Sequence, residues 1–167
     1  MPLGHDIAVF QKQLAALPFA TYQAGEIVLA AGTPSGRLLI LKNGAVTVVK
    51  DGNEIAKVTE PGAVLGELSA LLDQPHSADV LALEASQFHV ADATALLGQD
   101  SIALLYIATT LAQRLDGANK ALIELKKKLQ AGQPPAVISK AVEEIEVLLS
   151  PTGASLVYAG YPSDPFA

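Results

Sequence analysis

The strongest constraint on the fold is a succession of short β-forming runs between residues 19 and 90, each separated from the next by turn residues. Two of the separators, Asn43-Gly44 and Asp51-Gly52, are strong hairpin signals because both positions of such turns need a positive φ. Many short strands at a spacing of about 8–12 residues predict a mainly β domain, as a sandwich, jelly roll or small barrel. The predicted strands are Glu26–Leu29, Leu38–Leu41, Ala45–Lys50, Glu54–Val58, Val80–Leu83 and Gln87–Val90.

Helices are predicted on both sides of this β-rich region and once within it. A short helix begins at Gly66, directly after a strand at Ala63–Leu65, and interrupts the β pattern. The Gly/Pro-rich residues 131–135 form a linker, which separates a domain of residues 1–130 from a segment of 131–167 with one helix and an irregular tail. The other predicted helices are Ile7–Leu17 with Asp6 as a possible N-cap, Asp92–Leu97 with Asp92 as N-cap, Ser101–Leu129, and Ala136–Leu149 with Ile138, Val142, Ile145 and Leu149 on one face.

The long helix carries an apolar heptad pattern. Such a pattern over about four heptads predicts a seam through which two copies of the helix Ser101–Leu129 form a homodimer. The alternative is a helix packed on its own barrel, which we expect for its first half only. The two positions of the seam are Ala108, Leu115, Leu122 and Leu129, and, four residues earlier, Leu104, Leu111, Ala118 and Leu125.

The composition of the chain argues against several classes of function. The 167 residues carry a net charge of −6, which argues against a nucleic-acid binder that works through a basic face. The absence of cysteine excludes disulfides, thiolate metal sites and cysteine nucleophiles. The first residues lack the features of a signal peptide, and the apolar stretch Ala103–Ala112 is far shorter than the ~20 residues of a membrane span. We therefore expect a soluble, cytoplasmic protein without a membrane partner.

The corner at Gly66 is the candidate site. A glycine there lets a ligand approach the backbone closely, and the first amides of the short helix, those of Leu68 and Ser69, suit an anion. A negatively charged Glu67 beside a bound anion is unfavourable unless Glu67 accepts hydrogen bonds from a pair of hydroxyls. A sugar phosphate supplies both the anion for the amides and the hydroxyls for Glu67. The alternative is that Glu67 only complements the helix dipole.

The order of these residues resembles the cyclic nucleotide-binding domain family, which includes the sensor half of catabolite-activator-type regulators and the regulatory domains of cyclic-nucleotide-dependent kinases and channels. The resemblance extends from about Leu17 to Leu129. It implies a double-stranded β-helix (jelly roll) with flanking helices, a phosphate-binding cassette at 62–78 and a long C-terminal dimerisation helix. The residues that carry it are Gly25-Glu26-Ile27, Gly32, Gly36, Leu38-Leu39-Ile40-Leu41, Asn43-Gly44-Ala45-Val46, Gly62, Gly66-Glu67-Leu68-Ser69-Ala70-Leu71-Leu72 and Pro75-His76-Ser77-Ala78.

The resemblance also implies roles for single residues. Gly66 would permit close approach, and Glu67 would accept a hydrogen bond from the ribose 2′-hydroxyl. The amides of Leu68 and Ser69 would bind the cyclic phosphate, and the hydroxyl of Ser77 would contact the phosphate or the base. In the long helix, Ala118 and Asn119 fall near the position that touches the base.

One residue departs from the family pattern. The family normally carries an arginine after the cassette proline, and here His76 stands in its place. A charge-assisted hydrogen bond contributes roughly 1.5–3 kcal/mol, so its loss weakens phosphate binding by about tenfold to more than a hundredfold. The two interpretations are a retained but weaker or altered nucleotide site, and a degenerate pocket in which His76 is a partly exposed residue at the start of a strand.

Other functional classes fit the sequence less well. His5, His76 and His89 form no His-x-His pair, so no metal site is expected, and no Gly-x-Ser-x-Gly elbow supports a hydrolase. The 38 residues after Leu129 are too few for the winged helix-turn-helix of a transcription regulator, which argues against direct DNA binding. The expected function is that of a non-enzymatic, dimeric sensor that binds a cyclic nucleotide, cyclic AMP rather than cyclic GMP, and signals to an unknown downstream protein. The alternative is a dimeric interaction scaffold without a ligand.

Overall fold

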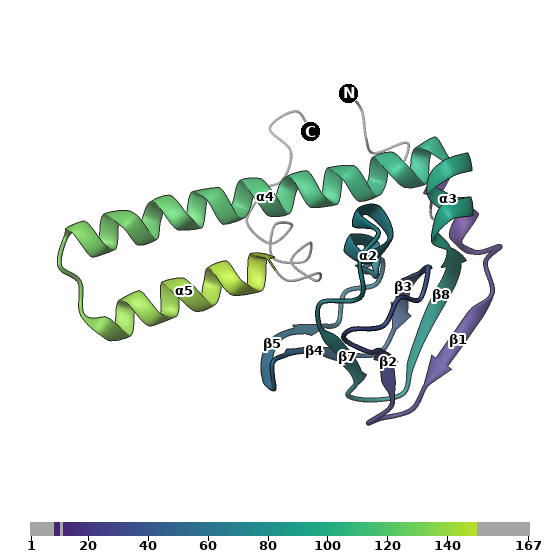
Figure 1. Ribbon diagram of the computed structural model, residues 1–167, viewed down its shortest axis with the longest axis horizontal. Coiled ribbons are helices and arrows are strands. Elements are labelled where there is room, and N and C mark those ends of the chain that lie inside the picture. Colours follow the sequence, from purple (N-terminus) through teal and green to yellow (C-terminus); the bar gives the residue numbers. More distant parts are fainter. Residues whose placement is uncertain (1–8, 11, 150–167) are drawn as a thin grey trace, which may run out of the picture.

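The structure, a computed structural model, describes residues 9–10 and 12–149, with side chains through Glu146. Its β domain consists of two antiparallel sheets that face each other (Figure 1). One sheet has the order β1-β8-β3-β6 and the other the order β2-β7-β4-β5. The strands are β1 (Phe19–Tyr22), β2 (Ile27–Leu29), β3 (Arg37–Asn43), β4 (Val46–Lys50), β5 (Asn53–Val58), β6 (Val64–Leu65), β7 (Asp79–Ala82) and β8 (Ser86–Asp92). The predicted mainly β, jelly-roll class is confirmed, and each predicted strand is present within two residues at either end, whereas β1 was not predicted.

The two hairpin signals have different outcomes. Asp51-Gly52 joins β4 to β5, and both residues have a positive φ, of 51° and 78°, as the prediction required. The prediction of a hairpin at Asn43-Gly44 is wrong, because β3 and β4 belong to different sheets. Gly44 lies instead at a corner, where a Cβ would meet the Ser86 side chain.

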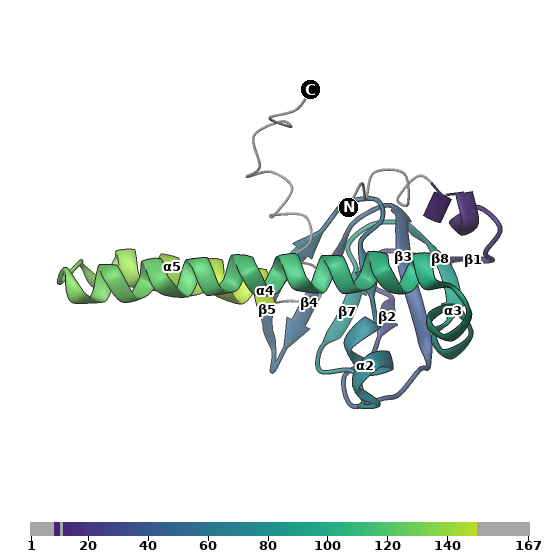
Figure 2. The ribbon, with the colours of Figure 1, turned by 90° about the horizontal axis from the view of Figure 1, so that it is seen from above.

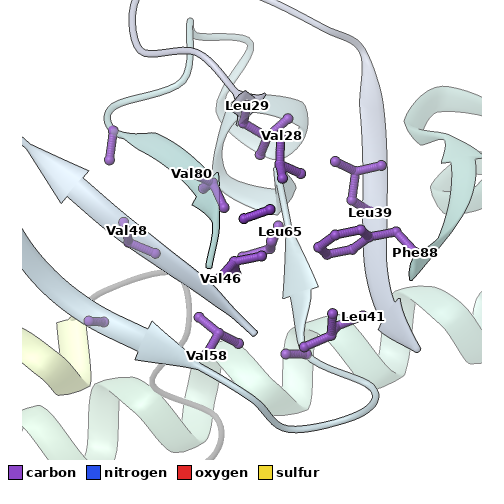
Figure 3. Packing of buried hydrophobic residues seen from close by; sticks show 14 residues of the cluster. Val28, Leu29, Leu39, Leu41, Val46, Val48, Val58, Leu65, Val80 and Phe88 are labelled. Carbon is purple, nitrogen blue, oxygen red and sulfur yellow. The ribbon is translucent and has the colours of Figure 1, made fainter. Parts of the chain in front are cut away.

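The space between the sheets is filled by aliphatic side chains around Phe88 (Figure 3). Alternation along β3 divides its residues between two cores. Leu39 and Leu41 point into this inner cluster, whereas Leu38 and Ile40 join a second cluster on the outer face of the sheet. Phe10, Leu14, Ala103 and Ile107 complete that second cluster, which holds the helices against the β domain.

The helices are α2 (Glu67–Leu72), α3 (Ala93–Gln99), α4 (Ser101–Gln130) and α5 (Pro135–Leu149). The Asp92 side chain caps α3 by accepting from the Ala95 amide, as predicted. Residues 9–10 and 12–14 are helical within the predicted N-terminal helix, while Asp6 and Ile7 lie outside the described residues. The tail after residue 149 also lies outside them.

The long helix α4 extends beyond the β domain, and α5 returns alongside it (Figures 1 and 2). The predicted linker is one residue shorter than expected, since Pro135 is the first residue of α5, a position that tolerates proline. Of the predicted apolar face of α5, Ile138 and Ile145 are half-buried, Val142 needs correction, and the side chain of Leu149 lies outside the described part of the structure. Ala141 is the buried centre of this face, because a small side chain allows the two helices to approach, whereas Val142 is exposed.

The heptad residues of α4 divide into two groups. Ala118 is buried and Leu111 and Leu125 are half-buried, so these three lie toward the rest of the chain. Leu115, Leu122 and Leu129 are each more than half exposed, and together with Leu104 and Ala108 they form an exposed stripe.

Within the described residues, no single helix is long and apolar enough to cross a membrane. Taken together, α3 and α4 satisfy the criteria of length and composition, but the two helices meet at an angle of 102°.

Candidate functional site

A small pocket opens where β6 ends and α2 begins. Six of the eight residues that the sequence predicts for the site line it: Gly66, Glu67, Leu68, Ser69, His76 and Ser77. Leu29, Leu65, Ala78 and Val80 complete the lining, so its floor is the end of the inner core. The predicted residues from 66 to 77 thus meet at one place.

Gly66 is required at this corner by the protein's own packing. Its φ is +91°, a left-handed conformation that side chains other than glycine rarely adopt. A Cβ at this position would lie 2.6 Å from the carbonyl oxygen of Arg37 on the adjacent strand β3. Contact with β3 therefore explains the glycine, and the expected approach of a ligand to it stays a prediction.

The N-terminus of α2 has no side-chain cap, because its N-cap residue is Gly66. The first helical hydrogen bond runs from the Ala70 amide to the Gly66 carbonyl. The amides that precede Ala70, including those of Leu68 and Ser69, have no acceptor within the helix. These donors line the pocket and suit an anion.

Glu67 is the most unusual residue of the pocket, since it is only 2% exposed. Both terminal nitrogens of the Arg114 guanidinium donate to its Oε1, at 3.1 Å and 2.9 Å. Its other oxygen, Oε2, is buried and has no hydrogen-bond partner among the described residues. A buried acceptor without a partner costs about 1–3 kcal/mol, and a ligand hydroxyl at this position would satisfy it.

Two effects of opposite sign act on the Glu67 carboxyl. Burial raises the pKa of Glu67 to about 7, although the charge of Arg114 and a hydrogen bond from the residue's own backbone both lower it. The geometry, with two donors on one oxygen, is that of an ionised carboxylate. Since burial dominates, the pair changes its protonation close to neutral pH.

His76 occupies the position at which the family pattern has arginine. It is buried, and its Nε2 lies 2.8 Å from the Ser35 hydroxyl on the loop between β2 and β3. Burial lowers the pKa of His76, so the ring is neutral at pH 7. In the interpretation of a degenerate pocket, His76 was expected to be partly exposed at the start of a strand; it is instead buried and precedes β7, which begins at Asp79, while the loss of the ligand stays a prediction.

The two serines of the pocket differ in availability. The Ser69 hydroxyl donates to the Gln74 carbonyl oxygen, so its proton is not available to a ligand, whereas the Ser69 amide has no acceptor within the helix. Ser77 is exposed, and its hydroxyl makes no hydrogen bond with another described residue.

Comparison with known families decides what kind of domain holds this pocket. Residues 19–99 match the model of the cyclic nucleotide-binding domain family. These residues form a cyclic nucleotide-binding domain. The pocket lies entirely within the matched segment.

Solved structures share the fold of this cyclic nucleotide-binding domain. The catabolite activator protein of Thermus thermophilus, 21% identical, matches with a TM-score of 0.58 over 96% of this chain and 88% of that chain. A triple mutant of the regulatory subunit of a cAMP-independent protein kinase A from Trypanosoma brucei, bound to cAMP in its A site, is 26% identical, with a TM-score of 0.52 over 59% of this chain and 38% of that chain.

Among curated proteins, glutaminase 2 of Bradyrhizobium diazoefficiens is 36% identical over an alignment of 106 positions that covers 59% of this chain and 17% of that protein. The chain spans only 10% to 20% of the curated proteins that it matches.

The two site residues predicted on the long helix do not line the pocket of the cyclic nucleotide-binding domain. Ala118 lies one helical turn beyond Arg114 and is buried, and Asn119 is exposed. Their predicted contact with a base stays a prediction.

Sequence reasoning missed two residues of this domain's site, Arg114 and Ser35. A signal for Arg114 was present in the helical spacing. Arg114 lies seven residues after Ile107 and four residues before Ala118, so it falls on the same face of α4 as these two buried residues. Ser35 had no such signal, since it lies in an exposed loop that is 41 residues from His76 in the chain.

Within the described residues, no three His, Asp or Glu side chains lie close enough together to hold a metal ion. The Nε2 of His76 faces Ser35, and the structure records no hydrogen bond between His76 and the adjacent Ser77.

Proposed function

We propose that this domain is a regulatory sensor module that binds a cyclic nucleotide, cyclic AMP rather than cyclic GMP. The observation that carries the proposal is the buried Glu67, with Oε1 held by Arg114 and Oε2 without a partner, beside the uncapped start of α2. A ribose phosphate supplies what both features lack, namely a hydroxyl donor for the carboxylate and an anion for the amides.

The proposed contacts follow from these groups. The Glu67 Oε2 accepts a hydrogen bond from the ribose 2′-hydroxyl, and the amides of Leu68 and Ser69 donate to the cyclic phosphate. Gly66 permits the approach, and His76 and the Ser77 hydroxyl add donors to the phosphate or the base. Ala118 and Asn119, on the turn of α4 after Arg114, contact the base.

Signalling in this proposal runs through Arg114. Glu67 belongs to the cassette and Arg114 to α4, so the ion pair is a direct link between the pocket and the long helix. A ligand that binds Glu67 alters the strength of the ion pair with Arg114. If the ligand makes better contacts with one position of α4 than with another, it shifts the population toward that position.

We further propose that two copies associate through α4. Leu115, Leu122 and Leu129 are more than half exposed at seven-residue intervals, so one of the two predicted heptad positions is available to a second copy. In this form the cytoplasmic module acts on a downstream protein, does not catalyse a reaction and does not bind DNA by itself. The acidic net charge of −6 supports the last point.

A second candidate is a dimeric scaffold that has lost its ligand. The neutral, buried His76, already paired with Ser35, favours it, because the pocket lining holds no arginine or lysine to balance a phosphate. The helices and the seam would then serve interactions with other proteins only.

Thermal melting of the full chain with millimolar cyclic AMP or cyclic GMP distinguishes the two candidates. The sensor predicts a rise in the melting midpoint by mass action on the folded state, larger for cyclic AMP. Glu67→Gln should remove the rise, and Glu60→Gln, an exposed glutamate outside the pocket, should retain it. An unchanged midpoint in the unmodified chain would establish the scaffold.

A further inference from the structure

The pocket contains no uncommitted cation. Its lining includes neither lysine nor arginine, and both terminal nitrogens of nearby Arg114 are bound to Glu67. A cyclic phosphate carries one negative charge, so a binding site for it benefits from a cation that comes from another part of the fold.

Arg37 lies at the edge of this pocket. It is the first residue of β3, which pairs with β6 in the register Leu39↔Leu65 and Ile40↔Val64. This pairing places the start of β3 next to the end of β6, where α2 begins. The position of Gly66 agrees, since a Cβ on it would lie 2.6 Å from the Arg37 carbonyl oxygen.

The alternation of β3 places Arg37 on the pocket side of the sheet. Leu39 and Leu41 point into the inner core, and Arg37 has the same parity. The pocket opens at the end of that same core, with Leu29, Leu65 and Val80 in its lining. Arg37 therefore lies on the inner face of the sheet, at its open end.

The Arg37 backbone is also tied to the residue that replaced the family's arginine. The Arg37 amide donates to the Ser35 hydroxyl at 3.3 Å, and the same hydroxyl lies 2.8 Å from His76 Nε2. The Arg37 side chain is exposed and forms no ion pair with any described residue. A long, flexible and uncommitted side chain thus starts from a backbone position adjacent to Gly66, a residue of the pocket lining.

We propose that Arg37 is the phosphate-contacting arginine of this site, supplied by β3 in place of the cassette arginine that His76 has replaced. This inference rests on the proposed function. A guanidinium group binds phosphate oxygens with two parallel hydrogen bonds, which neutral His76 does not provide. Because the cation comes from an exposed strand end, its contribution to affinity depends strongly on salt.

Calorimetric titration of the full chain with cyclic AMP tests the proposal, with Arg37→Lys, Arg37→Ala and Arg37→Glu. We expect affinity to fall in that order, by about tenfold for alanine at low salt and further for glutamate. Lys57→Ala, which removes an exposed cation from β5, is the matched control and should leave the affinity unchanged. Raising the salt concentration should weaken the unmodified chain more than Arg37→Ala.

Three results overturn the inference in distinguishable ways. Equal affinities in all Arg37 variants would exclude Arg37 and leave the proposed function intact. An equal loss of affinity on raising the salt, with and without Arg37, would show that the residue acts through structure and not through charge. No heat from the unmodified chain would overturn both the inference and the proposed function.

Discussion

Arg114 of α4 donates two hydrogen bonds to one oxygen of Glu67, and the other oxygen of the same carboxylate is buried without a partner. One oxygen of the carboxylate is therefore held by the long helix, while the other has no partner although Glu67 lines the pocket. In the proposed function, Glu67 is therefore the residue through which a bound ligand and α4 affect each other.

Substitution of Arg114 leaves the buried Glu67 carboxylate without its ion-pair partner. Arg114→Met should lower the free energy of unfolding by about 3 kcal/mol or more at pH 8, because breaking a buried pair leaves an uncompensated charge. The loss should be smaller at pH 6, where the isolated carboxyl is protonated. Urea denaturation measures both values. Lys127→Met breaks the exposed pair with Glu124, which solvent screens, so it should leave the free energy of unfolding nearly unchanged, and an equal cost for the two variants would contradict the prediction.

The raised pKa of Glu67 predicts a specific dependence of stability on pH. Its pKa rises from 4.5 to about 7 on folding, so its contribution to stability is fully present below pH 4.5 and is lost as pH rises through 7. The free energy of unfolding of the unmodified chain, relative to Glu67→Gln, should fall by a few kcal/mol between pH 5 and 8. His76, whose pKa is lowered, acts in the opposite direction in both proteins and cancels in this difference. A difference that is constant with pH would refute the shift.

The corner glycine is testable with a pair of alanine substitutions. Gly66→Ala forces a Cβ to 2.6 Å from the Arg37 carbonyl oxygen at a φ of +91°, so it should destabilise the protein by about 2 kcal/mol or more. Gly98→Ala places a Cβ in open space within α3, where it should stabilise by up to about 1 kcal/mol. Thermal melting compares the two. Similar effects of both would show that the contact with β3 is unimportant.

His76→Arg should strengthen the binding of cyclic AMP. The substitution restores a charge-assisted donor beside the amides of α2, which corresponds to a gain of roughly tenfold to a hundredfold in affinity. In the unmodified chain, affinity should rise as pH falls from about 8 to 6, because a bound phosphate favours protonation of His76. Calorimetry at the two pH values measures both effects. No gain from arginine in the Arg37→Ala background would mean that the pocket is shaped for a ligand without a phosphate.

If two copies associate through the exposed stripe of α4, as proposed, a charge at its centre should separate them. Leu122→Glu should produce monomers at concentrations where the unmodified chain is dimeric, as measured by sedimentation. Ile123→Glu is the matched control, since Ile123 is equally exposed but is rotated by about 100° around the helix. Dissociation by both variants, or by neither, would contradict a seam along Leu115, Leu122 and Leu129.

Much of the fold follows from local signals in the sequence. The Asp51-Gly52 turn has the positive φ values that its residues favour, and the Asp92 side chain caps α3. Asn43-Gly44 carries an equally strong local signal, yet it lies at a corner between sheets, where contact with Ser86 determines the geometry. A turn signal therefore indicates where the chain bends, while tertiary contacts determine which strands pair.

The candidate site was predictable where its residues are contiguous. The residues from Gly66 to Ser77 come together because one turn of helix and one loop carry them all. Arg114 and Ser35 reach the same place from 47 and 41 residues away, through the packing of α4 and of the loop before β3. Such contacts depend on how elements dock, which no short stretch of sequence encodes.

The two consecutive prolines between α4 and α5 have a consequence for how any movement is transmitted. Pro134 precedes Pro135 and is biased away from helical geometry, and neither has an amide hydrogen, so α4 cannot lengthen through this point into one continuous rod. The break between α4 and α5 is therefore a fixed feature of the chain. Because α5 packs along α4 and also touches β5, a displacement of α4 would move α5 with it and alter the contact between α5 and the β domain.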